Sequence, residues 1–155
     1  MRTRRIPPCR RSRRRGAVAV ESAVVLSVFL LILFGMLDLG LAVLNSNNLK
    51  DAAQQVSRTA TVRGQDASPQ FSTWGPTTYN GTAAFGDEIA SQAAATILIM
   101  PLNNVNIVVE WPDGGCNDGD RVRTTLTYSN PLIAPGLFGF SSCQLTGVST
   151  MRIAN

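Results

Sequence analysis

The stretch that decides the fold is RRRGAVAVESAVVLSVFLLILFGML, residues 13–37. A basic run and a glycine are followed by a long apolar segment, in which Glu21 is the only charged residue between Ala17 and Leu37. A helix of these 21 residues would rise about 31 Å, roughly the thickness of the hydrocarbon core of a bilayer. The stretch therefore predicts a helix that can span a membrane, with an acid one turn inside its N-terminal end.

The charges are unevenly distributed along the chain. The net charge is +4, but eight arginines precede Gly16, at positions 2, 4, 5, 10, 11, 13, 14 and 15. After Gly16, six basic residues stand against ten acidic ones, a net charge of −4. An Arg-rich arm can neutralise nucleic-acid phosphates, but basic residues directly before an apolar span are typical of an end that stays in the cytoplasm. We favour a basic cytoplasmic leader at 1–16 and infer no nucleic-acid partner.

A cleaved secretory signal also begins with basic residues, so the length of the apolar segment decides between the two interpretations. Ser22 to Leu37 are 16 uncharged residues, and after Asp38 the apolar sequence LGLAVL follows without a clear A-x-A cleavage site. A signal would have a shorter apolar core. We therefore expect a transmembrane helix at 17–44 that stays in the inner (cytoplasmic) membrane as a single pass, with the rest of the chain exported.

Glu21 is unusual because an acid inside a spanning helix is costly unless it is paired, protonated or near the interface. It can be a tolerated boundary residue. However, the order Gly16, Ala17 and Glu21, the fifth residue counted from Ala17, resembles the processing site of type IV prepilins. The resemblance implies that a prepilin peptidase cuts between Gly16 and Ala17. It also implies that Glu21 then offsets the charge of the new amino group, within its own helix or on a neighbouring subunit.

The resemblance narrows to one family over the stretch from Gly16 to about Arg58. This stretch is similar to the TadE-like pseudopilins of tight-adherence (Flp) pilus systems, and Ser22 stands where that family generally has Phe or Tyr. The C-terminal segment, which closes on Met-Arg at Met151, also resembles the family's usual ending. The matching elements are Gly16, Val20, Glu21, Phe34, Gly35, Asp38, Gly40 and the segment Leu49 to Ala60.

The resemblance implies a minor pilin-like membrane protein that helps to assemble a pilus. Its implied partners are a prepilin peptidase, other pilins or pseudopilins, and the inner-membrane assembly platform. Asp38, at the outer end of the span, could pair with a basic group on another subunit or mark the membrane boundary. The alternative function is that of an uncleaved, membrane-anchored binding protein whose exported domain holds a ligand or partner.

Catalytic motifs are absent from the sequence. It contains no histidine, no G-x-S-x-G, no P-loop and no H-E-x-x-H, and its one lysine, Lys50, has no identifiable chemical partner. The loop DGGCNDGD, residues 113–120, is rich in acids but lacks the ligand spacing of a calcium loop, so a glycine-rich turn is the better interpretation. We infer no catalytic residue, cofactor, metal or small-molecule substrate.

The exported part predicts an α+β fold. Apolar positions at helical spacing predict an amphipathic stalk helix at 45–63. If this helix is broken, the break is expected at NSNN, residues 45–48. The apolar face of the helix packs on its own domain or on partner subunits, and we favour its own domain. The face consists of Leu49, Ala52, Ala53, Val56 and Ala60.

The remaining residues, 64–155, predict a small pilin-like head. Residues 64–82 read as an irregular loop, and a second helix is expected from about Asp87 to Ile99 with Pro101 as its stop. Alternating apolar residues then predict an antiparallel sheet of about three strands, at 105–111, 122–128 and 145–153.

The three cysteines are sorted by topology. Cys9 lies in the leader, whereas Cys116 and Cys143 lie in the exported part, where disulfides persist. If the second and third strands pair, these two cysteines can lie at the same end of the sheet. A Cys116–Cys143 disulfide is therefore expected, with two free buried thiols as the alternative.

Overall fold

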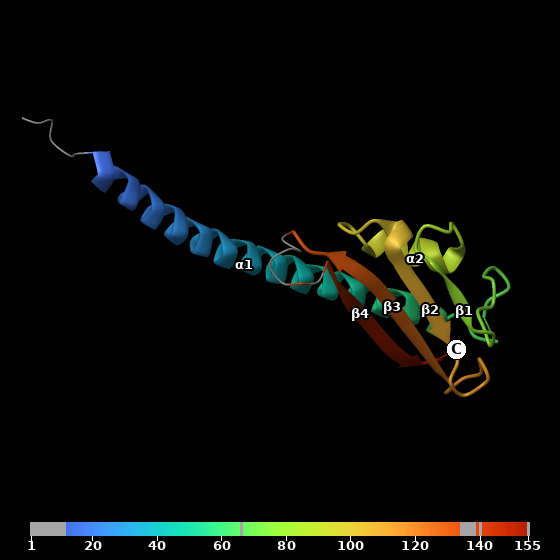
Figure 1. The fold of residues 1–155 in the computed structure, drawn as a ribbon. Helices are drawn as coiled ribbons and strands as arrows, with labels where there is room; N and C mark the ends of the chain where they lie inside the picture. Colours follow the sequence, from blue (N-terminus) through green and yellow to red (C-terminus); the bar gives the residue numbers. More distant parts are fainter. Residues whose placement is uncertain (1–11, 66, 134–138, 140, 155) are drawn as a thin grey trace, which may run out of the picture. The chain divides into compact units, whose positions relative to one another are not determined.

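The structure is a computed structural model that describes residues 12–65, 67–133, 139 and 141–154. The chain divides into two compact units, Met1–Leu37 and Asp38–Asn155. A long N-terminal helix, a second short helix and a four-stranded antiparallel sheet form an α+β, pilin-like fold, as the sequence predicted (Figure 1). The elements are α1 (Ser12–Thr61), β1 (Tyr79–Thr82), α2 (Glu88–Thr96), η1 (Leu102–Asn104), β2 (Val105–Glu110), β3 (Arg121–Pro131) and β4 (Ser142–Arg152).

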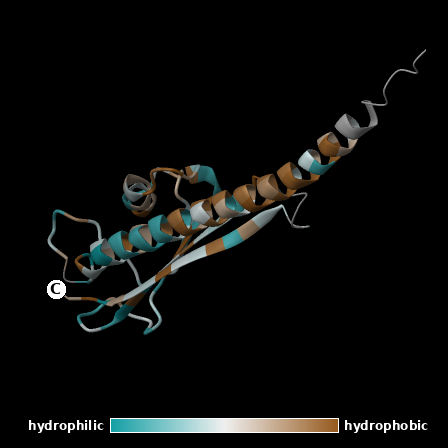
Figure 2. Ribbon diagram, turned by 90° about the vertical axis from the view of Figure 1, so that its left-hand side faces the viewer, coloured by the Kyte–Doolittle hydropathy of each residue, from teal (hydrophilic) through white to brown (hydrophobic). Residues whose placement is uncertain are grey.

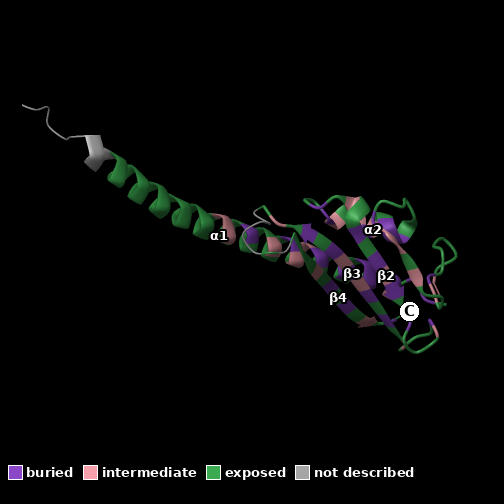
Figure 3. Cartoon of the chain, in the orientation of Figure 1, coloured by how far each residue is buried: buried purple, intermediate pink, exposed green. Residues whose placement is uncertain are grey.

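The first unit is the apolar part of α1. From residue 16 to residue 33 every residue is exposed, including the large apolar residues Val20, Phe29 and Ile32. Figure 2 shows this part of α1 as mostly hydrophobic, and Figure 3 shows it as exposed. A helix that is apolar on all sides is stable only where a membrane or a partner surrounds it. Within the described residues, α1 is the one helix that is long and apolar enough to cross a membrane.

The second unit is built on a meander of four strands in the order β1-β2-β3-β4, each antiparallel to the next. The three predicted strands are confirmed as β2, β3 and β4. β1 lies in the stretch 64–82, for which the sequence predicts an irregular loop, and its residues pair with β2 from Tyr79↔Val109 to Thr82↔Asn106. Its sequence, YNGT, shows no alternation of apolar and polar residues, because its place is set by main-chain pairing at the edge of the sheet.

The C-terminal half of α1 forms the core of this unit together with the sheet. The five residues of its predicted apolar face, from Leu49 to Ala60, are all fully or almost fully buried. They lie among the inward-facing side chains of β2 and β3, such as Ile107 and Leu126. Packing of this face on its own domain is thus confirmed. The helix also continues through residues 45–48 without the break that we considered there.

The compact second unit begins at Asp38, because the side chains of Asp38 and Asn45 are already buried in it. The boundary of the second helix differs from the prediction. The second helix ends at Thr96 instead of Ile99, since the backbone at Ile97 is extended, with φ −81° and ψ 106°. The amide of Ile97 still donates to the carbonyl of Ala93, which closes the last turn.

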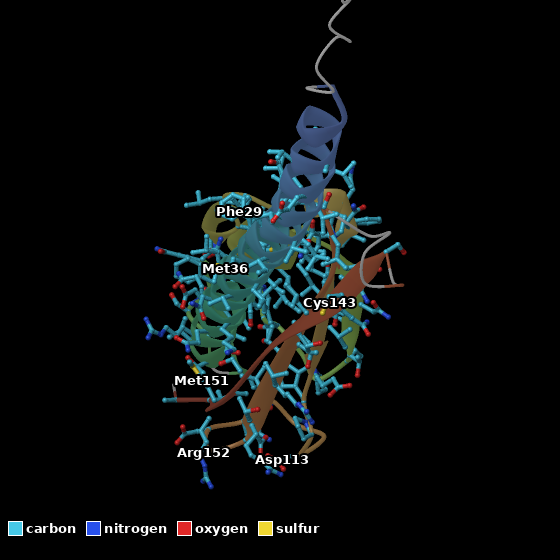
Figure 4. The ribbon with its side chains drawn as sticks, turned by 60° about the vertical axis from the view of Figure 1, so that its left-hand side comes forward. Phe29, Met36, Asp113, Cys143, Met151 and Arg152 are labelled. Carbon is cyan, nitrogen blue, oxygen red and sulfur yellow. The ribbon has the colours of Figure 1, made fainter. Side chains whose placement is uncertain are left out.

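The predicted Cys116–Cys143 disulfide is wrong: both cysteines are free, Cys116 buried and Cys143 exposed. Cys116 lies in the loop before β3, whereas Cys143 lies opposite Asn130, near the other end of that strand. Figure 4 labels Cys143 on β4. From Arg121 to Asn130 the strand extends about 30 Å at about 3.3 Å per residue, whereas a disulfide requires Cα atoms less than about 7 Å apart. The error came from strand direction, because in an antiparallel pair the residues that precede the two strands lie at opposite ends.

Candidate functional site

The predicted processing site lies near the start of the described part of α1. Gly16 and Ala17 both have helical backbone, and a Cβ built on Gly16 would meet no atom within 4 Å. Glycine in a helix interior costs about 1 kcal/mol relative to alanine, so Gly16 makes this turn easier to unwind than its neighbours. The predicted leader, 1–16, lies outside the described residues as far as position 11, as does Cys9.

Glu21 lies on an exposed face of the same helix. A shallow apolar groove runs along this face, lined by Val18, Glu21, Ser22, Val25, Leu26 and Phe29. Ala17 is four residues before Glu21, so the two are neighbours one turn apart on the helix surface. The structure thus places the predicted scissile bond and the acid on adjacent turns, about 6 Å apart along the helix axis.

Ser22 occupies the position after the glutamate. Its hydroxyl donates to the carbonyl oxygen of Val18 at 2.9 Å, and Ser27 does the same to Ala23 at 2.8 Å. A serine that bonds back to its own helix exposes little polar surface, which makes it tolerable in an apolar setting. Ser22 is therefore a small side chain whose hydroxyl is already satisfied.

Asp38 is placed differently from what the sequence suggested. Its side chain is buried, with 5% of its surface exposed, and its Oδ1 accepts a hydrogen bond of 2.8 Å from the amide of Ile133. Among the described residues, its Oδ2 has no hydrogen-bond partner. The carboxylate therefore holds the chain just after β3 against α1, and pairing with another subunit stays a prediction.

A second polar contact, which sequence reasoning missed, lies two turns further along α1. Asn45 is buried, and its amide nitrogen donates to the Oδ1 of Asn130 in β3 at 2.7 Å. Asp38 and Asn45 are seven residues apart and extend the buried face that continues at Leu49. The seven-residue spacing was the signal in the sequence that Asp38 and Asn45 lie on the buried face. However, polar residues within an apolar stretch are also typical of a membrane boundary.

An ion pair lies just beyond the C-terminal end of α1. The guanidinium of Arg63 lies 4.8 Å from the ring centre of Trp74 and forms an ion pair with Glu88, which also accepts a hydrogen bond from Ser72. The hydrogen bond from Arg63, followed by that from Ser72, lowers the pKa of Glu88 to about 2. The core-edge position of Trp74 and the charges that surround it give this cluster a structural role.

The acidic loop 113–120 is also tied by its own contacts. Asp113 forms an ion pair of 2.7 Å with Arg121, and the pKa of Asp113 is lowered to about 2, chiefly by the side-chain hydrogen bond from Arg121. Asp120 accepts a hydrogen bond of 2.9 Å from the amide of Asn117. In the described part of the chain, no three His, Cys, Asp or Glu side chains gather as metal ligands.

Comparison with known proteins identifies the N-terminal part. Residues 16–58 match the family model described as TadE-like protein. This segment belongs to the TadE-like family. A search of curated proteins and a search of solved structures give no match.

The TadE-like segment has informative limits. It begins at Gly16, the residue before the predicted cut, and ends at Arg58, near the end of α1. It therefore includes Glu21, Asp38 and most of the buried face of the helix.

Proposed function

We propose that this chain is a minor pilin-like membrane protein that assists the assembly of a tight-adherence pilus and is processed after Gly16. The observation that carries the proposal is the TadE-like match that starts at Gly16 and includes the apolar segment 16–33, which is exposed on all sides. The helix anchors the protein in the inner membrane with its N-terminus in the cytoplasm. The unit Asp38–Asn155 is exported.

Processing would turn the Gly16–Ala17 bond into a functional N-terminus. A prepilin peptidase needs the chain in extended form, and Gly16 lowers the cost of unwinding the first turn. Hydrolysis leaves an ammonium group on Ala17, one turn from the Glu21 carboxylate. In the low dielectric of a membrane the attraction between such charges is much stronger than in water, so Glu21 acts as the charge partner of this amine, in its own helix or on an adjacent subunit.

The partners follow from this role. They are the prepilin peptidase, other pilins or pseudopilins and the inner-membrane assembly platform, which meet the exposed apolar face of α1 around Phe29. We infer no enzymatic activity and no small-molecule substrate. Glu88 and Asp113 have pKa values lowered to about 2. Each forms an ion pair with an arginine of the same unit, Glu88 with Arg63 and Asp113 with Arg121.

The decisive experiment is mass spectrometry of the N-terminus of protein extracted from membranes. A mature terminus at Ala17 supports the proposal, and Gly16→Leu should leave the leader attached. A terminus at Met1 in the wild-type protein would favour an uncleaved anchor for an exported binding domain. A terminus near residue 45 would mean ordinary secretion and would refute both.

The role of Glu21 is tested by substitution. Glu21→Ala should leave insertion and cleavage intact but reduce recovery of the protein in sheared pilus fractions, because the new amine has lost its partner. Ser22→Ala is the matched control, since the Ser22 hydroxyl is satisfied within the helix and its loss should not change recovery. Normal recovery of Glu21→Ala would show that the pairing role is wrong.

A further inference from the structure

Among the described residues of the unit Asp38–Asn155, those at one end bear no exposed charge. Three stretches of sequence, 39–49, 89–109 and 124–151, contain no Asp, Glu, Lys or Arg. The fold brings parts of them together, because β2 begins opposite Tyr128, and the amide of Ile133 bonds to Asp38 at the start of the unit. Charged residues lie toward the other end of the sheet, where Arg121 of β3 lies opposite Arg152 of β4 in the strand register. Figure 4 labels Arg152 and Asp113 at this end.

Large apolar side chains are exposed at this same end. Leu98 and Ile99, between α2 and η1, are 84% and 62% exposed, and Ile133, just past β3, is also exposed. Exposed aliphatic side chains that lie singly on a surface are ordinary, but a group at one charge-free end indicates a contact surface. We call this surface the apolar end; its residues are Leu39, Val43, Leu44, Leu98, Ile99 and Ile133.

The outer face of α1 shows how far the apolar end extends. Leu39, Val43 and Leu44 are exposed although the opposite face of the same turns is buried in the domain at Asp38. From Asn47 onward the exposed positions of the helix become polar, a change that is visible along α1 in Figure 2. Residues 38–44 thus have their own domain on one side and an apolar surface on the other.

We propose that the apolar end lies in the interfacial layer of the lipid bilayer, in contact with headgroups and the upper acyl chains. The inference rests on the proposed function only in that α1 must span a membrane. Lipid is the expected occupant because the chain enters this unit at Asp38 directly from the apolar residues that end at Leu37.

Dimensions and charge both fit a lipid surface. The rise from Asp38 to Leu44 is about 9 Å along the helix, close to the depth of about 5–10 Å at which amphipathic surfaces enter the boundary between headgroups and acyl chains. Placing a charge there would be costly, and the one acid at this end, Asp38, is buried and accepts the amide hydrogen bond of Ile133. The apolar end of the unit Asp38–Asn155 thus contacts the lipid surface itself.

The test measures lipid contact by tryptophan fluorescence in the full chain. Ile99→Trp is compared with Val62→Trp, since Ile99 and Val62 are 62% and 60% exposed but Val62 lies beyond the C-terminal end of α1. Each variant is reconstituted in phosphatidylcholine vesicles with and without brominated phosphatidylcholine, which quenches tryptophan on contact. The native Trp74 and Trp111 are buried in the domain. Their emission is measured in the wild-type protein and subtracted from that of each variant.

The proposal expects bromolipid to remove most of the emission that Ile99→Trp adds and to leave that of Val62→Trp unchanged. Equal quenching of both variants, or of neither, would overturn it. Emission from Ile99→Trp that is blue-shifted but not quenched would mean that protein covers the apolar end, which also contradicts the proposal. Leu30→Trp distinguishes failure of this inference from failure of membrane spanning by α1. If Leu30→Trp is quenched and Ile99→Trp is not, only the lipid contact of the apolar end is wrong. If Leu30→Trp is not quenched, α1 does not span the membrane.

Discussion

The contact between α1 and β4 at Gly147 gives the sharpest prediction for the folded unit. A Cβ built on Gly147 would lie 2.6 Å from both the carbonyl carbon and the oxygen of Leu49 and 2.8 Å from the nitrogen of Lys50. These are main-chain atoms of a helix and cannot rotate away. To restore ordinary contact at 3.4 Å, α1 must move about 0.8 Å away from the sheet, which loosens the packing of every side chain on its buried face.

We expect Gly147→Ala to lower the free energy of unfolding by about 2 kcal/mol, within the range of about 1–3 kcal/mol found for overpacked cores. At a denaturant slope of about 1.5 kcal/mol per molar urea, this lowers the midpoint by about 1.3 M. The direction is diagnostic, because alanine in place of glycine within a strand is otherwise stabilising by about 0.5–1 kcal/mol.

The assay is urea unfolding of the full chain in detergent micelles, followed by the emission of Trp74 and Trp111, which are buried in this unit. The matched control is Gly40→Ala in α1, where an added Cβ meets no atom within 4 Å and the helix should gain about 1 kcal/mol. If Gly147→Ala unfolds at the same urea concentration as the wild-type protein, the close approach of helix and strand is wrong.

Three further predictions concern thiols, acid stability and a buried hydroxyl pair. In the native protein, maleimide should modify Cys143 but not Cys116, and both should react after unfolding without a reductant; a disulfide would block both. Because the pKa of Glu88 is lowered from 4.5 to about 2, its ion pair stabilises the fold fully above about pH 4.5 and is lost as the pH falls toward 2, so Glu88→Gln should flatten the urea midpoint over that window. Ser57 donates to the hydroxyl of Thr124 at 3.0 Å, so Ser57→Ala should cost about 1 kcal/mol, and adding Thr124→Val should cost less than the sum of the two single changes; additive costs would contradict the pair.

The elements of the second unit whose apolar residues recur at regular spacing could be predicted from the sequence. The buried face of α1 was found because a helix that packs on one sheet buries residues at regular spacing, as Leu49 and Val56 do. β2, β3 and β4 were found because each has one face in the core and the other in solvent.

What could not be predicted depends on partners that are distant in the chain and leave no side-chain pattern. Asp38 bonds to the amide of Ile133, 95 residues away, and a main-chain amide has no signature in the sequence. The register of β1 on β2 depends likewise on main-chain pairing. The separation of Cys116 and Cys143 required strand directions, which the apolar pattern of each strand does not contain.

The same helix that is apolar at its exposed N-terminal end is the core helix of the unit Asp38–Asn155, so its register on the sheet sets where this unit begins. A slip of one turn, about 5.4 Å, would carry Leu49 to the place of an alanine and would disturb the apolar packing. It would also break the hydrogen bonds that Asp38, Asn45 and Ser57 make with groups in or beside β3. Buried groups left without partners are expensive, so these contacts fix the helix in one register. They therefore also fix Asp38, the point at which the chain enters the folded unit, beside the end of the sheet that bears the exposed aliphatic side chains.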